Sequence, residues 1–583
     1  MSNSFRAFLG DNCAMSRSFD IVIVGGGTAG CVLANRLTAD GKRTVALVEA
    51  GPDTPPDHQN QELWDSYPIV AYFDPRHHWT DLRVYHQPPT VSGPDRRSPR
   101  RYEQARVMGG GSSINGMMAN RGAPGDYDEW ESLGAPGWGW SNVLPYFRKL
   151  ERDLDCDGPL HGTDGPLPLR RVPEAEWPGF SRAAAEALAA SGLRFTFDQH
   201  ERFEPGYFPI VINNEHDRRG STATAYLDHS VRKRTNLSLF PNTQVTHVVR
   251  DGSRITGVDV RSSMGAQSTF GAKEVILSCG AIHTPALMQR LGIGDGSLLQ
   301  KAGIDIVVHR QGVGRNLQEH PQLAVSSLLT EEARQPWSQR RHIFAGFRYS
   351  SGVDGCAETD MYGVVVNRAG WHSVGQRLGG FLIWVNKAYS AGWVRARSSS
   401  PDVEPHVELN LLSDDRDRLR LEDGLRRLAA MYRHPAMRGA AKFPFPTSYT
   451  ERSRNLAIVS RSNRIRVAPT AKALEGPAPL RRRLMQRRVS GGVSLFEITH
   501  DQEALSAFVQ ERAHGTWHCC GTTRMGREDD PAAVTDQRGR VYGVTGLRVA
   551  DASLMPTVPR ANTNLPVIMI AEKIADSVIE DWR

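Results

Sequence analysis

The segment AHGTWHCCGTTRMG, residues 513–526, gathers four side chains whose types and spacing suit chemistry. His514 and His518 are four residues apart, and Cys519 and Cys520 follow directly. Two histidines with two thiolates suit a zinc site, and adjacent thiols suit a redox pair. A single histidine near neutral pH suits a general base. The segment alone leaves all three roles open.

Local sequence disfavours the metal and thiol roles. Gly515 interrupts the helix that would bring His514 and His518 onto one face, and adjacent cysteines seldom reach one tetrahedral ion together. We therefore predict no metal site. The chain has seven cysteines, an odd and sparse set that indicates a reducing compartment. We interpret Cys519 and Cys520 as small apolar residues packed behind His518, with a redox role as the alternative.

The N-terminal region predicts the element that would hold a dinucleotide. Residues 19–24, FDIVIV, have the composition of a buried parallel strand, and a helix-like segment follows GGGTAG. Gly25, Gly27 and Gly30 fit the G-x-G-x-x-G pattern, which places a pyrophosphate at a helix N-terminus. Glu49 ends the next strand, TVALVE, where a carboxylate binds the ribose 2′-hydroxyl and disfavours NADP. The motif does not choose between NAD and FAD.

Four further segments accompany this motif. Residues 105–117 form a Gly/Ser-rich loop, and residues 273–294 run from an apolar strand through a glycine turn into a helix. Residues 312–321, GVGRNLQEHP, are a polar turn whose purpose periodicity does not reveal. Near the C-terminus the strand GLRVADAS precedes a helix with Pro566 in its first turn. The preceding ANTN and the positive helix end would suit an electron-rich ring or an oxyanion.

Together these segments resemble the glucose-methanol-choline (GMC) family of FAD-dependent oxidoreductases. The resemblance runs from about residue 19 to the C-terminus and rests on GGGTAG…VEAG, ARVMGGGSSIN, GAIHTPALMQRLGIG, GVGRNLQEHP and WHCCGTTRMG…ASLMPTVPRANTN, in that order. It implies an α/β fold, with a doubly wound, Rossmann-like FAD-binding domain and an α+β substrate domain built on an antiparallel sheet. The segments NRGAPGDYDEW and TVPRANTNLP look most like members that oxidise furanic and aryl alcohols.

The resemblance also implies how the 583 residues divide, and this length exceeds what one hydrophobic core usually supports. We expect a discontinuous FAD-binding domain from residues 19–170, 215–325 and 510–583. Residues 171–214 and 326–509 would form the substrate domain, with an Arg-rich insert at 451–492 that we expect to be a surface loop and helix. Residues 1–18 are expected to be a loose extension.

By position in the family motifs, the catalytic base falls on His518 and its partner on Asn562. A base is needed because a neutral alcohol is a poor hydride donor, whereas an alkoxide is a good one. Asn562 would donate a hydrogen bond to the developing alkoxide. The implied reaction oxidises a primary alcohol to the aldehyde, and onward to the acid for some substrates, with O₂ as acceptor. The alternatives are a dehydrogenase that uses a quinone, and a flavin-dependent lyase or photodecarboxylase.

The remaining site residues also come from the resemblance. Cofactor contacts would be Gly25, Gly27, Thr28, Ala29, Gly30, Glu49, Ala50, Trp79, Arg106, Gly110, Asn115, Gly116, Met117, Val245, Asp551, Asn562 and Thr563. The substrate pocket would be lined by Met117, Leu382, Trp384 and Trp517. Members with covalent FAD carry a histidine in the second Gly-rich loop, which here has Ile114 and Asn115 instead. We therefore expect non-covalent FAD.

Composition limits the partners. The net charge of +7 is mild for this length, and no apolar run approaches the roughly 20 residues of a membrane span. We expect a small-molecule alcohol and O₂ or another acceptor as partners, no nucleic acid, no membrane span and a cytoplasmic location. The insert at 451–492 is read as a solvated surface, with a dock for an anionic or carrier-tethered substrate as the alternative.

Overall fold

A computed structural model describes residues 17–57, 61–89, 97–447 and 449–583. Most of the predicted N-terminal extension therefore lies outside the described residues. Its last two positions, Arg17 and Ser18, are not loose, because they begin strand β1 (Arg17–Val24).

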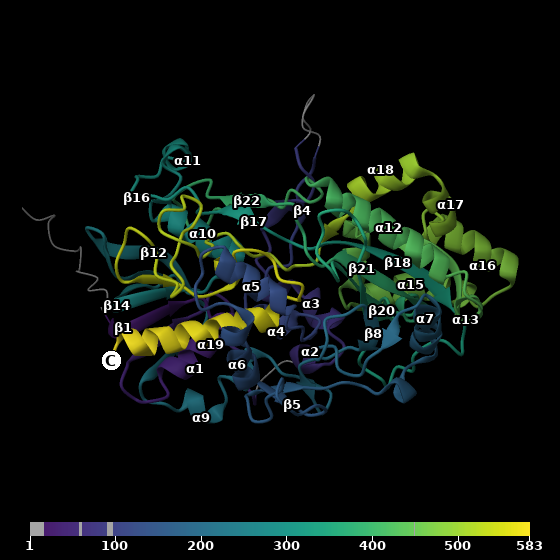
Figure 1. The fold of residues 1–583 in the computed structure, drawn as a ribbon, viewed down its shortest axis with the longest axis horizontal. Coiled ribbons are helices and arrows are strands. Elements are labelled where there is room, and N and C mark those ends of the chain that lie inside the picture. The colour runs from purple at the N-terminus through teal and green to yellow at the C-terminus, as the bar shows by residue number, and fades with distance from the viewer. Residues whose placement is uncertain (1–16, 58–60, 90–96, 448) are drawn as a thin grey trace, which may run out of the picture.

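A seven-stranded sheet forms the left half of the molecule in Figure 1, with strand order β11-β2-β1-β14-β13-β12 and β26 beside β14. Its parallel strands are β1, β2 (Val45–Val48), β11 (Leu237–Phe240), β14 (Gln267–Leu277) and β26 (Leu547–Val549). The antiparallel β12 (Thr243–Asp251) and β13 (Arg254–Ser262) complete it. The central strands are buried, as their β-branched composition predicts.

Three helices connect or cover these parallel strands. Helix α1 (Thr28–Leu37) follows β1, α10 (Gly280–Arg290) follows β14, and α19 (Asn564–Asp581) is the C-terminal helix. Figure 1 shows α19 running alongside α1. The strand, glycine turn and helix predicted at 19–37 and at 273–294 are confirmed, as is the α/β fold class.

A second, mostly antiparallel sheet has the order β24-β18-β21-β20-β19-β8-β7, with β25 beside β18. Its strands are β7 (Arg194–Phe195), β8 (Gly206–Pro209), β18 (Pro321–Leu329), β19 (Ile343–Tyr349), β20 (Met361–Val366), β21 (Leu378–Val385), β24 (Ala441–Thr447) and β25 (His514–Gly515). Helices α7 (Gly179–Ala190) and α12 (Asp415–Met431) contact it. The antiparallel sheet is confirmed. Because β18 straddles residue 325, the domain boundaries stay a prediction.

A smaller five-stranded sheet has the order β17-β22-β23-β3-β4. Its strands are β3 (Arg83–Tyr85), β4 (Arg100–Arg101), β17 (Arg315–Leu317), β22 (Gly392–Arg395) and β23 (His406–Glu408). Short helices and strands elsewhere are α2 (Gln61–Trp64), α3 (Ile69–Tyr72), α4 (Gly111–Ile114), α5 (Pro124–Ser132), α6 (Trp140–Leu150), α8 (Thr222–Ala225), α9 (His229–Arg232), α11 (Gly296–Lys301), α13 (Pro435–Ala440), β5 (Glu151–Asp153), β6 (Leu167–Leu169), β9 (Asn214–Glu215), β10 (Arg218–Arg219), β15 (Ile293–Gly294) and β16 (Val308–His309).

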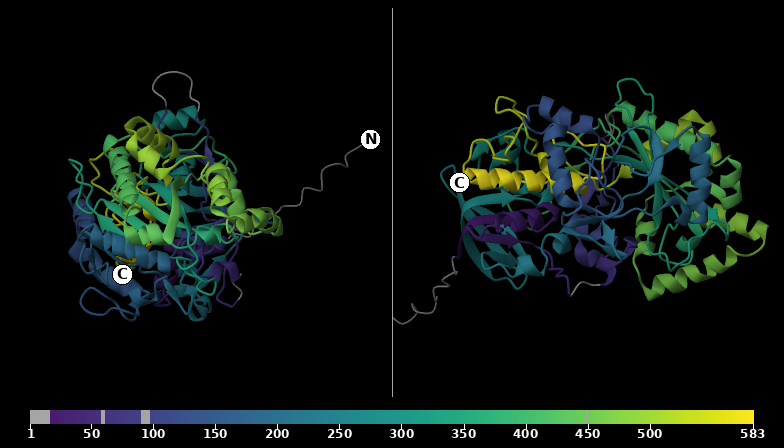
Figure 2. Two further views of the ribbon diagram at one scale, coloured as in Figure 1. Left: turned by 90° about the vertical axis from the view of Figure 1, so that its right-hand side faces the viewer. Right: turned by 60° about the horizontal axis from the view of Figure 1, so that its bottom comes forward.

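The Arg-rich insert is helical along most of its length. It forms α14 (Glu451–Ala457), α15 (Arg461–Ala473), α16 (Ala478–Leu484) and a π-helical turn, Met485–Val489. Helices α17 (Leu495–His500) and α18 (Gln502–Arg512) then lead back to β25. Figure 2 shows these helices at the periphery of the molecule. No helix in the described residues is long and apolar enough to cross a membrane.

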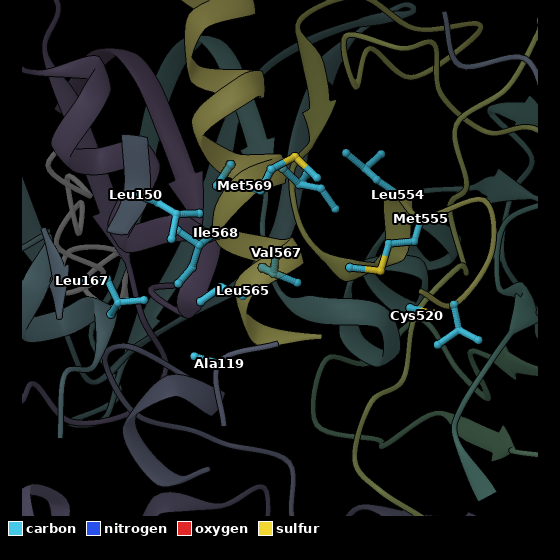
Figure 3. Packing of buried hydrophobic residues seen from close by; sticks show 14 of the residues in the cluster. Ala119, Leu150, Leu167, Cys520, Leu554, Met555, Leu565, Val567, Ile568 and Met569 are labelled. Carbon is cyan, nitrogen blue, oxygen red and sulfur yellow. The ribbon is translucent and has the colours of Figure 1, made fainter. Parts of the chain in front are cut away.

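The largest apolar core surrounds α19. Figure 3 shows Leu565 and Ile568 of this helix close to Leu150, with Cys520 beside Met555 on the other side of the helix. Cys520 is fully buried in this core. The helix that ends the chain is therefore held by apolar packing on more than one side, and its N-terminus is fixed in space.

The close approach of β1 and α1 gives a first prediction. A Cβ added at Gly30 would lie 2.0 Å from the carbonyl oxygen of Gly25, so Gly30→Ala must push α1 away from its strand. We expect a loss of about 1–3 kcal/mol in the free energy of unfolding, as for other overpacked sites. Thermal unfolding measures it.

The matched control is Gly439→Ala. Gly439 is exposed in α13, and a Cβ there has no neighbour within 4 Å among the described residues. Because alanine is the better helix former, this variant should be neutral or stabilised by up to about 1 kcal/mol. Equal unfolding midpoints for the two variants would contradict the close packing at Gly30.

Candidate active site

One cavity of about 610 Å³ reaches from the first sheet to the second. It is lined by Val24 and Val48 at the ends of β1 and β2, and by Ala324 and Phe381 of β18 and β21. It also collects most of the residues expected from the sequence, namely Gly25, Gly27, Thr28, Ala29, Glu49, Ala50, Trp79, Gly110, Asn115, Gly116, Met117, Val245, Leu382, Trp384, Trp517, His518, Asp551, Asn562 and Thr563. The fold thus brings segments from both ends of the chain to one site.

Two of the expected cofactor residues are not among those that line the cavity. Gly30 is buried in α1, where it allows the helix to approach β1. The Arg106 guanidinium lies 4.9 Å from the ring of Trp79, which does line the cavity. Gly30 thus belongs to the packing of α1 on β1, and Arg106 lies against a residue of the cavity wall.

The β1–α1 end of the cavity fits a dinucleotide. Helix α1 begins after Gly27 with no capping side chain and no acidic residue in its first turn, so its first N–H groups are available to phosphate oxygens. The Glu49 carboxylate accepts from the backbone N–H groups of Gly26 at 2.8 Å and Gly51 at 2.7 Å. Burial raises the pKa of Glu49 to about 7. Asn564 lines the cavity at the start of α19, and its buried side-chain amide nitrogen has no hydrogen-bond partner among the described residues.

Two cavity residues adopt a left-handed backbone that side chains rarely accept. Met117 has φ 62° and Trp517 has φ 63°. Such a conformation costs on the order of 1–3 kcal/mol in each case and persists only where the surroundings enforce it. At Trp517 the enforcing group is a neighbouring carboxylate.

That carboxylate is Glu319, which is buried between β17 and β18. It accepts from the backbone N–H of His518 at 2.9 and 3.0 Å and from the hydroxyl of Thr516 at 2.9 Å. The Tyr102 hydroxyl donates to it at 2.9 Å. Burial raises the pKa of Glu319, and these donors oppose that shift. The bonds to Thr516 and His518 hold the turn at Trp517 from both sides.

A chain of amides fixes the Nε2 side of His518. The Tyr362 hydroxyl donates to the Gln199 side-chain oxygen at 3.0 Å, and the Gln199 amide donates to the Asn120 oxygen at 2.5 Å. The Asn120 amide in turn donates to the Asn562 oxygen. The Asn562 amide nitrogen therefore points toward His518, 3.1 Å from Nε2. An NH₂ group in that place requires a lone pair on Nε2.

A second chain fixes the Nδ1 side. The carbonyl of Pro559 can only accept, so His320 carries its hydrogen on Nε2, 3.2 Å away. Burial lowers the pKa of His320 to about 3, and its Nδ1 is then an acceptor. His518 Nδ1 lies 2.9 Å from this atom and 2.7 Å from the Thr516 hydroxyl oxygen. His518 must therefore carry its hydrogen on Nδ1.

Both chains demand the same tautomer of His518. Its Nδ1 carries the hydrogen, and the lone pair of Nε2 faces the cavity beside Asn562. Burial, with a further contribution from His320, holds the pKa of His518 well below its ordinary range. The ring is neutral near pH 7 and can accept a proton from a group in the cavity.

The walls beside this pair are aromatic and apolar. Trp384 stacks on Tyr362 at a centroid distance of 4.8 Å, and Trp517 meets the ring edge of Tyr72 at 5.0 Å. Leu382 and Met117 also line the cavity. A flat apolar ligand fits such walls.

The other three side chains of the 513–526 segment are separated from this pair. His514 lies in β25 rather than on a helix with His518, and its ring stacks on Tyr449 at 5.2 Å. The Cys519 thiol lies 3.1 Å from the Tyr102 hydroxyl and 3.6 Å from Glu319, and burial raises the pKa of both cysteines. Within the residues that the structure describes, both thiols are free.

The described residues contain one cluster with metal-ligand spacing, Asp153, Cys156 and His161. Its carboxylate pairs with the guanidinium of Arg171 at 2.7 Å and with His161 at 3.1 Å. These ion pairs already balance the charge of Asp153. The pKa of His161 is raised to about 10, so its ring nitrogens are protonated near pH 7 and cannot bind a metal. This cluster is an ionic network distant in sequence from His518.

Several residues of the site were missed from the sequence: Glu319, His320, Thr516, Gln199, Asn120 and Tyr362. For Glu319 and His320 the signal was present in GVGRNLQEHP, but a polar turn does not reveal what it contacts. No local sequence pattern marks Gln199 and Asn120 as site residues, because their place in the site depends on hydrogen bonds between segments far apart in the sequence.

Comparisons with known proteins identify the family of the chain. The model of the GMC oxidoreductase family matches residues 19–322 with its N-terminal part and 388–571 with its C-terminal part. The chain is 43% identical over 573 residues to a 5-(hydroxymethyl)furfural oxidase of Methylovorus sp. (strain MP688), covering 96% of this chain and 98% of that protein. It is 32% identical to human mitochondrial choline dehydrogenase, over 96% of this chain and 89% of that protein.

Among solved structures, a pyridoxine 4-oxidase from Mesorbium loti shares the fold with a TM-score of 0.79 and 24% identity, covering 96% of this chain and 99% of that one. The two family models together cover most of the chain, and the relatives align along nearly all of it. The chain belongs to the GMC oxidoreductase family, whose members depend on FAD.

Proposed function

We propose that this protein oxidises a primary alcohol to the aldehyde with FAD as cofactor and O₂ as electron acceptor, and carries some aldehyde hydrates on to the acid. The observation that carries the proposal is the lone pair of His518 Nε2 beside the Asn562 amide, at an apolar cavity that fits a dinucleotide. The family, and the furfural oxidase among its members, support the same reaction.

The two side chains divide the work on the alcohol. His518 Nε2 accepts the hydroxyl proton, and the Asn562 amide donates to the oxygen as negative charge develops there. When bound, FAD would accept the hydride that leaves the alcohol carbon, and O₂ would then take up the electron pair together with two protons, one from that hydride and one from His518, to give H₂O₂. Trp517 and Trp384 exclude water and orient a flat substrate. Furanic and aryl alcohols are the substrates that this geometry supports best.

Three finer points belong to the proposal. FAD binds non-covalently, in keeping with the absence of histidine from residues 105–117. The location is cytoplasmic, which suits the six free cysteines of the described chain. The substrate is anionic, free or tethered to a carrier, and Arg368 supports its charge.

Arg368 is buried, lines the cavity and has no ion pair within the described residues. Its guanidinium stacks on Tyr67 at 4.4 Å and on Trp337 at 4.3 Å. One nitrogen donates to the carbonyl oxygens of Gln339 and Arg340, while Nε and Nη1 have no hydrogen-bond partner in the part of the chain that the structure describes. A buried guanidinium without a counter-ion is costly, and a carboxylate on the substrate would offset that cost.

The role of His518 is tested by His518→Gln. Without the base we expect the anaerobic rate of flavin bleaching by an aryl alcohol to fall by about 10²–10⁴. The control is His514→Gln, since His514 lines the same cavity but stands outside the network of His518. Stopped-flow absorbance measures both rates.

The same instrument separates oxidase from dehydrogenase. The reduced enzyme is mixed with O₂, and fast reoxidation is expected. Unchanged bleaching in His518→Gln would refute the base assignment. Slow reoxidation would refute O₂ as the acceptor and point to a quinone or another acceptor.

The pH dependence follows from the lowered pKa of His518. The neutral ring is the active form and exists above its pKa. The bleaching rate should therefore stay level as the pH falls through 6.5, the ordinary histidine value, and decline only in more acidic buffer. Anaerobic stopped-flow across this range measures it. A rate that is half-lost near pH 6.5 would show that the base is not held neutral by its surroundings.

Substrate charge is tested by Arg368→Met. We expect the KM for a carboxylate-bearing aryl alcohol to rise about tenfold, while the KM for the neutral alcohol stays the same. Arg340→Met is the control, because Arg340 stacks on Trp337 at 4.4 Å but is paired with Asp65. Steady-state H₂O₂ assays compare the two substrates. Equal changes for both alcohols would remove Arg368 as a charge-selecting residue.

A further inference from the structure

The insert at 451–492 carries an unusual share of the charge of the protein. It contains eleven arginines and lysines and two glutamates, a net charge of +9. Because the whole chain carries +7, all the other residues together carry −2. The excess positive charge of the molecule thus belongs to this one segment.

Few of these charged side chains form ion pairs with other described residues of the protein. Arg454 pairs with Glu103 and Glu451, and Glu475 pairs with Arg377. The other basic residues of the insert form no ion pair within the part of the chain that the structure describes, and all but the partly exposed Arg481 are exposed. They are Arg452, Arg461, Arg464, Arg466, Lys472, Arg481, Arg482, Arg483, Arg487 and Arg488. Their mutual repulsion has no internal compensation, which indicates an external anion.

Apolar side chains are exposed among them. Ile465 is 73% exposed, Val459 47% and Leu480 45%. On α15, Arg461, Ile465 and Lys472 share the outward face, and the helix is anchored through Val467 and Ala471 on its other side. The insert contains no aromatic residue. It lacks the stacking platforms that single-stranded nucleic acids use, whereas basic residues interspersed with aliphatic ones suit a lipid surface.

The insert lies at one end of the molecule, where an extended flat surface such as a bilayer could contact it. Its helix α16 lies at the opposite end of the molecule from the C-terminus (Figure 1). Its first helix, α14, contributes Ser453 and Ala457 to the lining of the active-site cavity. A surface that engages the insert would therefore lie close to one wall of that cavity.

We propose that the insert docks the enzyme on an anionic lipid surface. The unpaired arginines contact lipid phosphates, and Ile465, Val459 and Leu480 enter the headgroup region. Both contributions are needed because either signal alone binds weakly. Docking is peripheral and reversible, and it places the α14 wall of the cavity beside the bilayer. The proposal does not depend on the reaction proposed above.

Vesicle co-sedimentation of the holoenzyme tests it. The probes are phosphatidylcholine vesicles with and without phosphatidylglycerol, at low and at high salt. We expect binding to the anionic vesicles only, weakened by salt. Neutralising four exposed arginines of the insert (Arg464→Gln, Arg466→Gln, Arg482→Gln, Arg483→Gln) should weaken binding roughly tenfold or more.

The control loses the same charge from exposed residues outside the insert (Arg250→Gln, Arg254→Gln, Lys301→Gln, Arg583→Gln). It should bind like the wild type, apart from a small effect of net charge. For the apolar part, Ile465→Ser should weaken binding, whereas Met264→Ser, at a residue 94% exposed elsewhere, should not. Flavin absorbance and the unfolding midpoint confirm that each variant is loaded and folded.

Three results would overturn the proposal. The first is absence of the wild type from the anionic pellet at low salt. The second is equal weakening by the insert and control variants, which would reduce the effect to net charge. The third is release of the enzyme from the vesicles by an acidic carrier protein or by DNA at a concentration far below that of the anionic lipid. Such tight binding would identify that class of partner instead.

Discussion

The geometry of this site depends on one buried carboxylate. Glu319 accepts hydrogen bonds from the backbone of His518, from Thr516 and from Tyr102, so it fixes the turn that carries the His518 imidazole. The left-handed backbone of Trp517 lies between two of those anchors. A charge buried without these donors would be costly, and a strained turn without the charge would relax. Each therefore stabilises the other, and together they hold the imidazole against Asn562.

The two hydrogen-bond chains around His518 come from different parts of the fold. The amide chain runs through Gln199 and Asn120 and is tied to β20 by Tyr362, whereas the other runs from Pro559 through His320 at the start of β18. Because they are independent and agree on the tautomer, disturbing one still leaves the other. The second sheet supports both chains, through Tyr362 of β20 and through His320, which directly precedes β18.

The sequence was sufficient to predict those strands, turns and helices that a local residue pattern specifies. The glycine pattern at Gly25 to Gly30 forces a tight turn and close packing, and Pro566 marks the first turn of α19, so local pattern alone places strand, turn and helix. Contacts between segments far apart in the sequence could not be predicted, because residue periodicity does not encode them. Glu319 meets His518 across about 200 residues, and the limits of the substrate sheet depend on which strand β18 pairs with. The insert was expected to be a surface loop and helix and is helical along most of its length. Its helices were hard to place from the apolar pattern, because few positions, among them Val467, Ala471 and Leu474, are buried within a charged sequence.

The same amide chain that exposes the lone pair of His518 also limits how long the ring can stay protonated. Once Nε2 carries a hydrogen, it meets the NH₂ group of Asn562, whose oxygen is held by Asn120 and cannot turn to accept. The neighbouring His320 is also buried, so the surroundings of both rings solvate a positive charge poorly. This burial lowers the pKa of His518. The imidazolium is thus tolerated only while an oxygen in the cavity accepts from it. A proton taken up at Nε2 is therefore held only while such an oxygen remains in place, and it is lost when that partner leaves.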